Sequence, residues 1–157
     1  MALETREQET AVVRKLRADD LEAVIALDAK VTGRRRTEYY RLKMKQNLAE
    51  AGIALSLVAE LDGIFAGFLL SRVYYGEFGL IEPAAVLDTI AVHPDFRERG
   101  VGTALLDQLR TDLAGLGVPR LQTEVSWSDP RLITFFHHQG FRPAERFCLD
   151  LDLESRR

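Results

Sequence analysis

The sequence predicts a fold of the α/β or α+β class, in which helices flank a mixed central sheet of about six to seven strands. Two observations predict it. Asp62-Gly63 separates two apolar runs, and Asp-Gly between such runs is typical of an antiparallel hairpin. Later apolar runs alternate with helical patterns, as in units that build parallel strands. The chain has 157 residues, which suits one domain, so we expect both kinds of strand in one sheet.

The expected element order is β-α-α-β-β-β-α-β-α-β. The expected bounds, in chain order, are 11–17, 21–27, 34–50, 53–60, 64–73, 84–92, 102–116, 121–125, 130–139 and 141–153. Residues 1–10 are expected to form a frayed or disordered N-terminus, and residues 11–157 a single domain.

Local signals support these bounds. Asp19 and Asp20 precede apolar residues at helical spacing, which predicts a helix start. High charge density predicts that the second helix is the more exposed. Pro94 cannot donate to a ladder, so the strand of residues 84–92, expected near the centre of the sheet, ends before it.

The last two helices carry equally clear signals. The earlier one has an apolar stripe, formed by Leu105, Leu106, Leu109, Leu113 and Leu116. Asp129 is a typical N-cap, and Pro130 suits the first helical position because its missing N–H is not needed there. Trp127, Phe135, Phe141 and Phe147 are expected to be core or interface aromatics.

Composition excludes several functional classes. The formal charge is −3, so the basic excess that captures nucleic acid is missing. The single Cys148 cannot form an internal disulfide, reads as a buried hydrophobe, and makes no zinc set with three scattered histidines. No secretory signal and no apolar run of about 18 residues is readable, so we expect a cytoplasmic protein with no metal and no membrane contact.

The most informative pattern is a glycine pair after the strand that ends at Val92. Gly100 and Gly102 remove side chains where a helix begins, and the first-turn N–H groups of a helix attract anions. A Walker A loop needs a lysine where Thr103 stands, and a dinucleotide fingerprint needs a glycine where Leu105 stands, so neither fits. The alternative is that the glycines only make a tight turn.

Two segments resemble the GNAT superfamily of acyl-CoA-dependent N-acetyltransferases. The run Arg97-Glu98-Arg99-Gly100-Val101-Gly102 matches that superfamily's Arg/Gln-x-x-Gly-x-Gly/Ala signature, and residues 87–102 resemble its strand-turn-helix core. Residues 135–141 look like its later helix, which ends in Gly-Phe. The resemblance is specific between about Asp88 and Phe141, and only topological before that.

The resemblance implies transfer of an acetyl group from acetyl-CoA, as co-substrate, to a primary amine of a small molecule, protein or peptide. The residues that it implies for acetyl-CoA are Ile90, Ala91 and Val92 along the pantetheine arm, Arg97, Glu98, Arg99, Gly100, Val101, Gly102 and Thr103 around the pyrophosphate, and Asp129 and Phe136 on the later helix. A homodimer is a further possibility that the resemblance implies.

An amine acceptor must lose a proton before it attacks the thioester, so a base is useful. Glu124 is the first candidate, because it matches the glutamate of ribosomal-protein N-acetyltransferases in that superfamily, and partial burial on a strand would raise its pKa. Asp88 on the central strand is the second candidate. A purely structural carboxylate is the alternative at both positions.

The sequence departs from the superfamily at the later helix. Phe136 stands where a tyrosine commonly reprotonates the leaving thiolate, and Asp129 replaces the usual asparagine. His137 and His138 follow, and we expect both to face solvent. The alternative function is therefore a catalytically weak GNAT-fold module that binds acyl-CoA as a sensor or regulator.

The predicted second helix and its approach are basic, through Arg34, Arg35, Arg36, Arg41, Lys43 and Lys45. As a hypothesis, this charge repels polyamines and suits an acceptor with a carboxylate, a phosphate or an acidic peptide nearby. The alternative is a solvated helix face with Glu38 as an internal partner.

Overall fold

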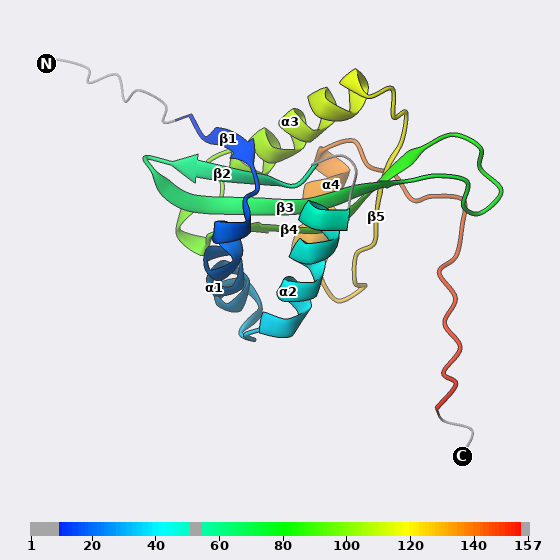
Figure 1. Cartoon of the computed structure of the whole chain (residues 1–157), viewed down its shortest axis with the longest axis horizontal. Helices are drawn as coiled ribbons and strands as arrows, with labels where there is room; N and C mark the ends of the chain where they lie inside the picture. Colours follow the sequence, from blue (N-terminus) through cyan, green and yellow to red (C-terminus); the bar gives the residue numbers. More distant parts are fainter. Residues whose placement is uncertain (1–9, 51–54, 155–157) are drawn as a thin grey trace, which may run out of the picture. The chain divides into compact units, whose positions relative to one another are not determined.

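A computed structural model describes residues 10–50 and 55–154. They divide into two compact units, the first ending at Glu124 and the second beginning at Val125. The first unit contains the sheet and most of the helices (Figure 1). The predicted tail of residues 1–10 lies almost wholly outside the described residues, as does Ile53 at the start of the predicted hairpin.

Five strands form one mixed sheet in the order β1-β2-β3-β4-β5. They are β1 (Val12–Lys15), β2 (Leu57–Leu61), β3 (Ile64–Tyr74), β4 (Ala84–Val92) and β5 (Leu121–Thr123). The first three pairings are antiparallel, and β4 pairs with β5 in parallel. The predicted α/β class with a mixed, helix-flanked sheet is confirmed.

The helices are α1 (Leu21–Thr32), α2 (Thr37–Lys45), α3 (Val101–Gly115) and, in the second unit, α4 (Pro130–His138). A π-helical turn, Gln46–Glu50, follows α2, and 3-10 turns occupy Ala18–Asp20 and Pro94–Phe96. In the first unit, α1 and α2 cover one face of the sheet and α3 covers the other (Figure 1).

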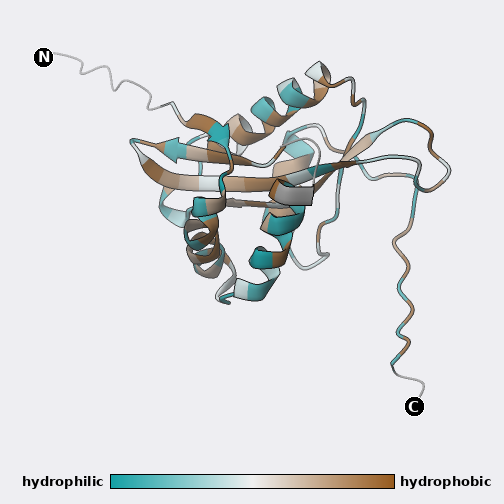
Figure 2. Ribbon diagram, in the orientation of Figure 1, coloured by the Kyte–Doolittle hydropathy of each residue, from teal (hydrophilic) through white to brown (hydrophobic). Residues whose placement is uncertain are grey.

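The β2–β3 hairpin forms where the sequence predicts it. Asp62 and Gly63 both adopt positive φ angles, 52° and 74°, as a two-residue type I′ turn requires. Its strands carry much of the core, which includes Val58, Phe68 and Leu70 packed against Ile25 of α1 and Tyr40 of α2. The central strands are accordingly hydrophobic along most of their length (Figure 2).

The predicted last strand or hairpin, residues 141–153, is wrong: no strand occurs between residues 141 and 154 of the described chain. Its side chains at alternate positions are exposed, namely Phe147, Leu149, Leu151 and Leu153. Apolar alternation predicts a strand face, but a strand also needs a ladder partner, and the described residues supply none here. The sheet therefore has five strands in the described chain, not six to seven.

Three smaller expectations fail for related reasons. Cys148 is exposed, not buried, because the segment around it packs against no other strand. Trp127 and Phe147 are 98% and 94% exposed, so neither is a core aromatic, and an interface role for them stays a prediction. Leu116 is exposed because α3 ends at Gly115, before the predicted stripe is complete.

A partly buried ion pair joins β1 to the start of α1. Arg14 donates two hydrogen bonds of 2.8 Å to the Asp20 carboxylate, which also accepts one from the backbone N–H of Arg17 at 2.8 Å. Burial raises the pKa of Asp20, but the hydrogen bonds from Arg14 and Arg17 outweigh it, so the pKa is lowered overall. The ionised carboxylate therefore stabilises the fold.

We expect Asp20→Asn to lower the free energy of unfolding by about 1–3 kcal/mol at neutral pH. Because the pKa of Asp20 is lower in the folded state than in the unfolded state, the ionised carboxylate stabilises the fold at pH values above the unfolded-state pKa of about 3.9. This contribution is lost as the pH falls through the folded-state pKa. Urea denaturation should thus show the difference from wild type shrinking below about pH 4. Glu22→Gln, at an exposed pair with Arg35, is the matched control and should change little.

Candidate active site

A β-bulge marks the middle of β4. In the β3–β4 register, Thr89 pairs with Leu70 and Leu87 pairs with Ser71, so Asp88 is the extra residue. A bulge locally bends the strand and re-aims a side chain. The Asp88 side chain contacts Lys43 of α2, and so it lies on the face of the sheet that α1 and α2 cover.

Beyond the bulge, one edge of β4 is open. The parallel pairing with β5 ends at Leu87 and Thr123, where the Thr123 hydroxyl donates to the Leu87 carbonyl oxygen at 2.8 Å. The N–H of His93 donates to the Ala66 carbonyl oxygen at 2.7 Å, so strand alternation turns the backbone groups of Ile90 and Val92 away from β3. No described strand pairs with them there. An extended chain can add to this edge.

Alternation gives the neighbouring residue a different role. The backbone of Ala91 faces Phe68 of β3, and its side chain is buried in the core. Of the three predicted strand residues, Ile90 and Val92 therefore present backbone donors and acceptors to the open edge.

The N-terminus of α3 follows this edge directly. Glu98 and Gly100 both have positive φ angles, 63° and 75°, which turn the chain into the helix. Gly100 is the N-cap and supplies no side-chain hydrogen bond, and the first helical bond runs from the Ala104 N–H to the Gly100 carbonyl oxygen at 2.9 Å. The N–H groups of Val101 and Gly102 thus project from the helix end, which attracts anions.

The charges around this helix end suit an anion. The first turn of α3 contains no acidic residue. Arg97 is half-buried, and Arg99 is exposed with its guanidinium 5.6 Å from the centre of the Phe96 ring. Thr103 is exposed on the first turn, and Gly102 is buried.

The Asp88 carboxylate has two neighbouring cations, and one of its oxygens accepts no hydrogen bond from the described residues. Its side chain is 13% exposed, and its Oδ2 atom lies 3.6 Å from the Lys43 Nζ and 3.8 Å from the Arg72 Nε. Within the described chain, this buried Oδ2 atom has no hydrogen-bond donor. The Asp88 side chain therefore lies between two cations, and its Oδ2 atom accepts no hydrogen bond from the described residues.

Glu124 is placed differently from the prediction. β5 ends at Thr123, so Glu124 is the residue directly after the last β4–β5 pair, and continuing the register would put it beside Asp88. Its side chain is exposed, so the partial burial expected of it is wrong. The early end of β5 is the reason, because Glu124 lies beyond the last β4–β5 pair and no described strand covers it there.

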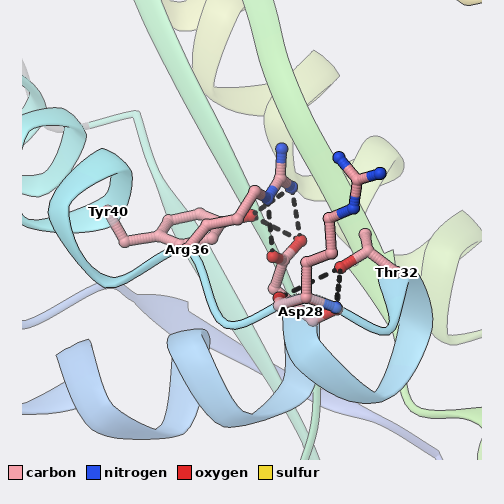
Figure 3. A network of polar contacts seen from close by, with 5 residues as sticks. Asp28, Thr32, Arg36 and Tyr40 are labelled. Atoms are coloured by element: carbon pink, nitrogen blue, oxygen red, sulfur yellow. Dashed lines mark hydrogen bonds and ion pairs between the residues drawn. The ribbon is translucent and has the colours of Figure 1, made fainter.

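The basic segment before and within α2 is mostly paired with acids. Arg36 donates to both oxygens of the buried Asp28, at 2.9 and 2.6 Å, and the Tyr40 hydroxyl donates to Asp28 at 2.7 Å (Figure 3). Burial, followed by the Asp28 hydrogen bond, raises the pKa of Tyr40 well above its usual range, so its hydroxyl stays protonated. This cluster ties α2 to α1 and pairs the charge of Arg36 with the buried Asp28.

Two further pairs reduce the charge of this segment. Arg35 pairs with Glu22 at 2.9 Å, and Arg41 pairs with Glu38 at 2.8 Å, as the alternative interpretation of the sequence expects. Lys43 points instead to Asp88. The broad basic face predicted from the sequence is therefore narrower than expected.

The second unit holds the remaining predicted residues. Asp129 caps α4 by accepting a hydrogen bond from the Leu132 N–H at 3.1 Å, as predicted. Phe136 is buried and packs against Phe135 and Phe141, with ring centres 5.4 and 4.9 Å apart. His137 and His138 are exposed, as expected. Asp129 and Phe136 thus have structural roles within their own unit.

Sequence reasoning missed Arg72. It lies on β3, in an apolar run, and a charged residue inside such a run was the available signal. Among the described residues, no group of three or more His, Cys, Asp or Glu side chains is arranged to hold a metal ion. A search of the described helices finds none that is both long and apolar enough to cross a membrane.

Comparison with protein families decides the affiliation, because the model of the acetyltransferase (GNAT) family matches residues 11–141. The chain belongs to this family. The matched range includes the open β4 edge, the N-terminus of α3 and both candidate carboxylates. The GNAT fold expected from the sequence is therefore confirmed.

The chain is also similar to individual acetyltransferases. The [ribosomal protein bS18]-alanine N-acetyltransferase of Salmonella typhimurium is 36% identical over 98 residues, which are 62% of this chain and 60% of that enzyme. The chain thus aligns with less than two thirds of that relative's length.

Two solved structures have the same fold. An aminoglycoside N-acetyltransferase, AAC(6′)-Iy, in complex with CoA has a TM-score of 0.76 at 20% identity, covering 92% of this chain and 95% of that one. A ribosomal-protein-alanine N-acetyltransferase from Brucella melitensis biovar Abortus 2308 has a TM-score of 0.73 at 20% identity, covering 92% of this chain and all of that one.

Proposed function

We propose that this GNAT family member is an N-acetyltransferase that moves an acetyl group from acetyl-CoA to a primary amine. The observation that carries the proposal is that the open β4 edge leads to the N-terminus of α3. This helix end has no side-chain capping hydrogen bond and no acidic residue in its first turn. An extended thioester arm needs the first feature, and a diphosphate needs the second. Family membership and relatives named as N-acetyltransferases support the same activity.

The residues present fit acetyl-CoA as a substrate. Ile90 and Val92 would bond the pantetheine arm through their backbone groups, and the N–H groups of Val101 and Gly102 would bind the diphosphate. The backbone of Glu98 and Gly100 turns the chain into this helix, and Arg97, Arg99 and Thr103 lie around it. We also propose contacts of acetyl-CoA with Ala91, Asp129 and Phe136, as the resemblance implies.

The reaction requires proton removal, bond exchange and release of a thiol. The ammonium group of the acceptor gives a proton to a base, the free amine forms a C–N bond with the acetyl carbon, and the C–S bond breaks. The nitrogen then gives its second proton to the leaving thiolate, directly or through water, so the products are the amide and the free thiol of CoA. We propose Glu124 as the base, directly or through water, and Asp88 as the second carboxylate of the site. The thiolate leaves with a pKa of about 8.5, so it needs little help from an acid, which fits a phenylalanine at position 136.

We expect the purified protein to release free thiol from acetyl-CoA when a primary amine acceptor is added. Thiol release across a panel of amines, amino acids and peptides is the measurement, with acetyl-CoA alone as the background. Saturable binding of acetyl-CoA without acceptor-stimulated release over the whole panel would contradict the enzyme and favour the alternative, an acyl-CoA sensor. The sensor is the alternative because Phe136 stands where a tyrosine commonly reprotonates the leaving thiolate in this family.

A further inference from the structure

Two cations at the proposed site have no hydrogen-bond acceptor. Lys43 and Arg72 come from different elements, α2 and β3, and meet at Asp88, the bulged residue of β4. At 3.6 and 3.8 Å, both contacts are longer than hydrogen bonds. In the residues that the structure describes, neither side chain donates a hydrogen bond to a protein acceptor, so their N–H groups are available to a ligand.

These cations contact Asp88, the residue that the continued β4–β5 register would put beside Glu124, the proposed base. Asp88 is on the sheet face that α1 and α2 cover, directly after the last β4–β5 pair, and Glu124 follows the same pair on β5. Asp88 compensates one of the two positive charges, so the cluster of Lys43, Arg72 and Asp88 keeps a net charge of about +1. Lys43 and Arg72 are 22% and 43% exposed, so water or a ligand can reach both.

Three other basic residues of α2 and its approach do not share this property, while Arg34 and Lys45 are exposed on the surface. Arg35, Arg36 and Arg41 are each paired with an acid. Lys43 and Arg72 are thus the two basic side chains that meet beside Asp88 on β4. A guanidinium and an ammonium with free donors form a typical recognition pair for a carboxylate.

We propose that Lys43 and Arg72 bind a carboxylate of the acceptor, so that the substrate class is a primary amine that also carries a carboxylate. This inference rests on the proposed acetyltransferase activity. The amine of such an acceptor approaches Glu124, and its carboxylate meets Lys43 and Arg72, while Asp88 positions the two cations. A polycationic acceptor meets repulsion at the same place, because the cluster has net positive charge.

Matched acceptors test this substrate class. Acetyl-CoA-dependent thiol release is measured for glutamate against its decarboxylated counterpart γ-aminobutyrate, for alanine against ethylamine, and for the dipeptide amides Asp-Ala against Asn-Ala. The first two pairs test free amino acids, and the third tests an acidic peptide. We expect kcat/KM to be at least about 10-fold higher for the member with the additional carboxylate in one or more pairs, with spermidine poorer than either member.

Variants locate the preference. Arg72→Gln and Lys43→Gln should each reduce that kcat/KM ratio by about 10-fold, since one charge-assisted hydrogen bond is lost, and Arg72→Lys should retain part of it. The ratio between paired acceptors cancels any effect on acetyl-CoA or on proton removal. Arg35→Gln removes a positive charge from an exposed pair elsewhere and should leave the ratio unchanged.

Two outcomes overturn different statements. Thiol release that responds to amines but shows no carboxylate preference, or a preference that survives both Gln variants, contradicts the carboxylate site and leaves the acetyltransferase intact. No acceptor-stimulated release with any amine contradicts the proposed function itself. Retained cooperative unfolding of each variant confirms that a lost preference does not come from a lost fold.

Discussion

Gly102→Val is expected to weaken CoA binding on the order of 100-fold, equivalent to roughly 2.8 kcal/mol. Gly102 is the second residue of α3, where backbone N–H groups project from the helix end. A branched side chain there would stand between these groups and the diphosphate, at the cost of about two charge-assisted hydrogen bonds. Isothermal titration calorimetry with CoA measures the loss.

The same helix supplies the control for this variant. Gly115 ends α3, and a Cβ atom built there would meet no atom within 4 Å. Gly115→Val should therefore bind CoA like the wild type. Because Gly102 is buried, thermal unfolding of Gly102→Val and of the smaller Gly102→Ala is measured as well, to separate lost CoA binding from a lost fold. Unchanged CoA affinity in a folded Gly102→Val protein would show that α3 does not hold the diphosphate.

Glu124→Gln is expected to reduce kcat by about 100-fold near neutral pH, within the usual range for loss of a general base. The amide cannot accept the acceptor's proton. An amine of pKa about 10 increasingly loses its proton to solvent as the pH rises, so the defect should shrink toward alkaline pH. The measurement is a pH–rate profile with saturating acetyl-CoA.

Asp88→Asn is the matched comparison for the base. Asp88 lies between Lys43 and Arg72, so its loss should change acceptor KM and carboxylate preference more than the shape of the pH–rate profile. A Glu124→Gln profile parallel to that of the wild type, together with a pH-dependent defect in Asp88→Asn, would reverse the two assignments.

Local chemistry explains which parts of the fold the sequence predicts well. The turn at Asp62 and Gly63 needs two positive φ angles, and that pair of residues supplies them with no help from distant contacts. Asp129 caps α4 through a hydrogen bond to a residue three positions later. The Gly100 N-cap and the helix after it follow from a contiguous motif.

Non-local pairing explains what the sequence does not predict. The alternation in residues 141–153 describes a face without specifying a partner strand, and the described chain forms no ladder there. The exposure of Glu124 depends on where β5 stops pairing with β4. Arg72 and Lys43 come together at Asp88 only because a bulge and a helix–sheet contact join three distant segments.

Calorimetric titration of the wild-type protein with CoA and, separately, with pantetheine tests the central claim most directly. Pantetheine keeps the arm that would add to β4 but lacks the diphosphate that would meet the N–H groups of Val101 and Gly102. Saturable binding of CoA to one site per chain, with far weaker binding of pantetheine, is the predicted result. No heat and no saturation with CoA, or equal affinity for the two ligands, would contradict it.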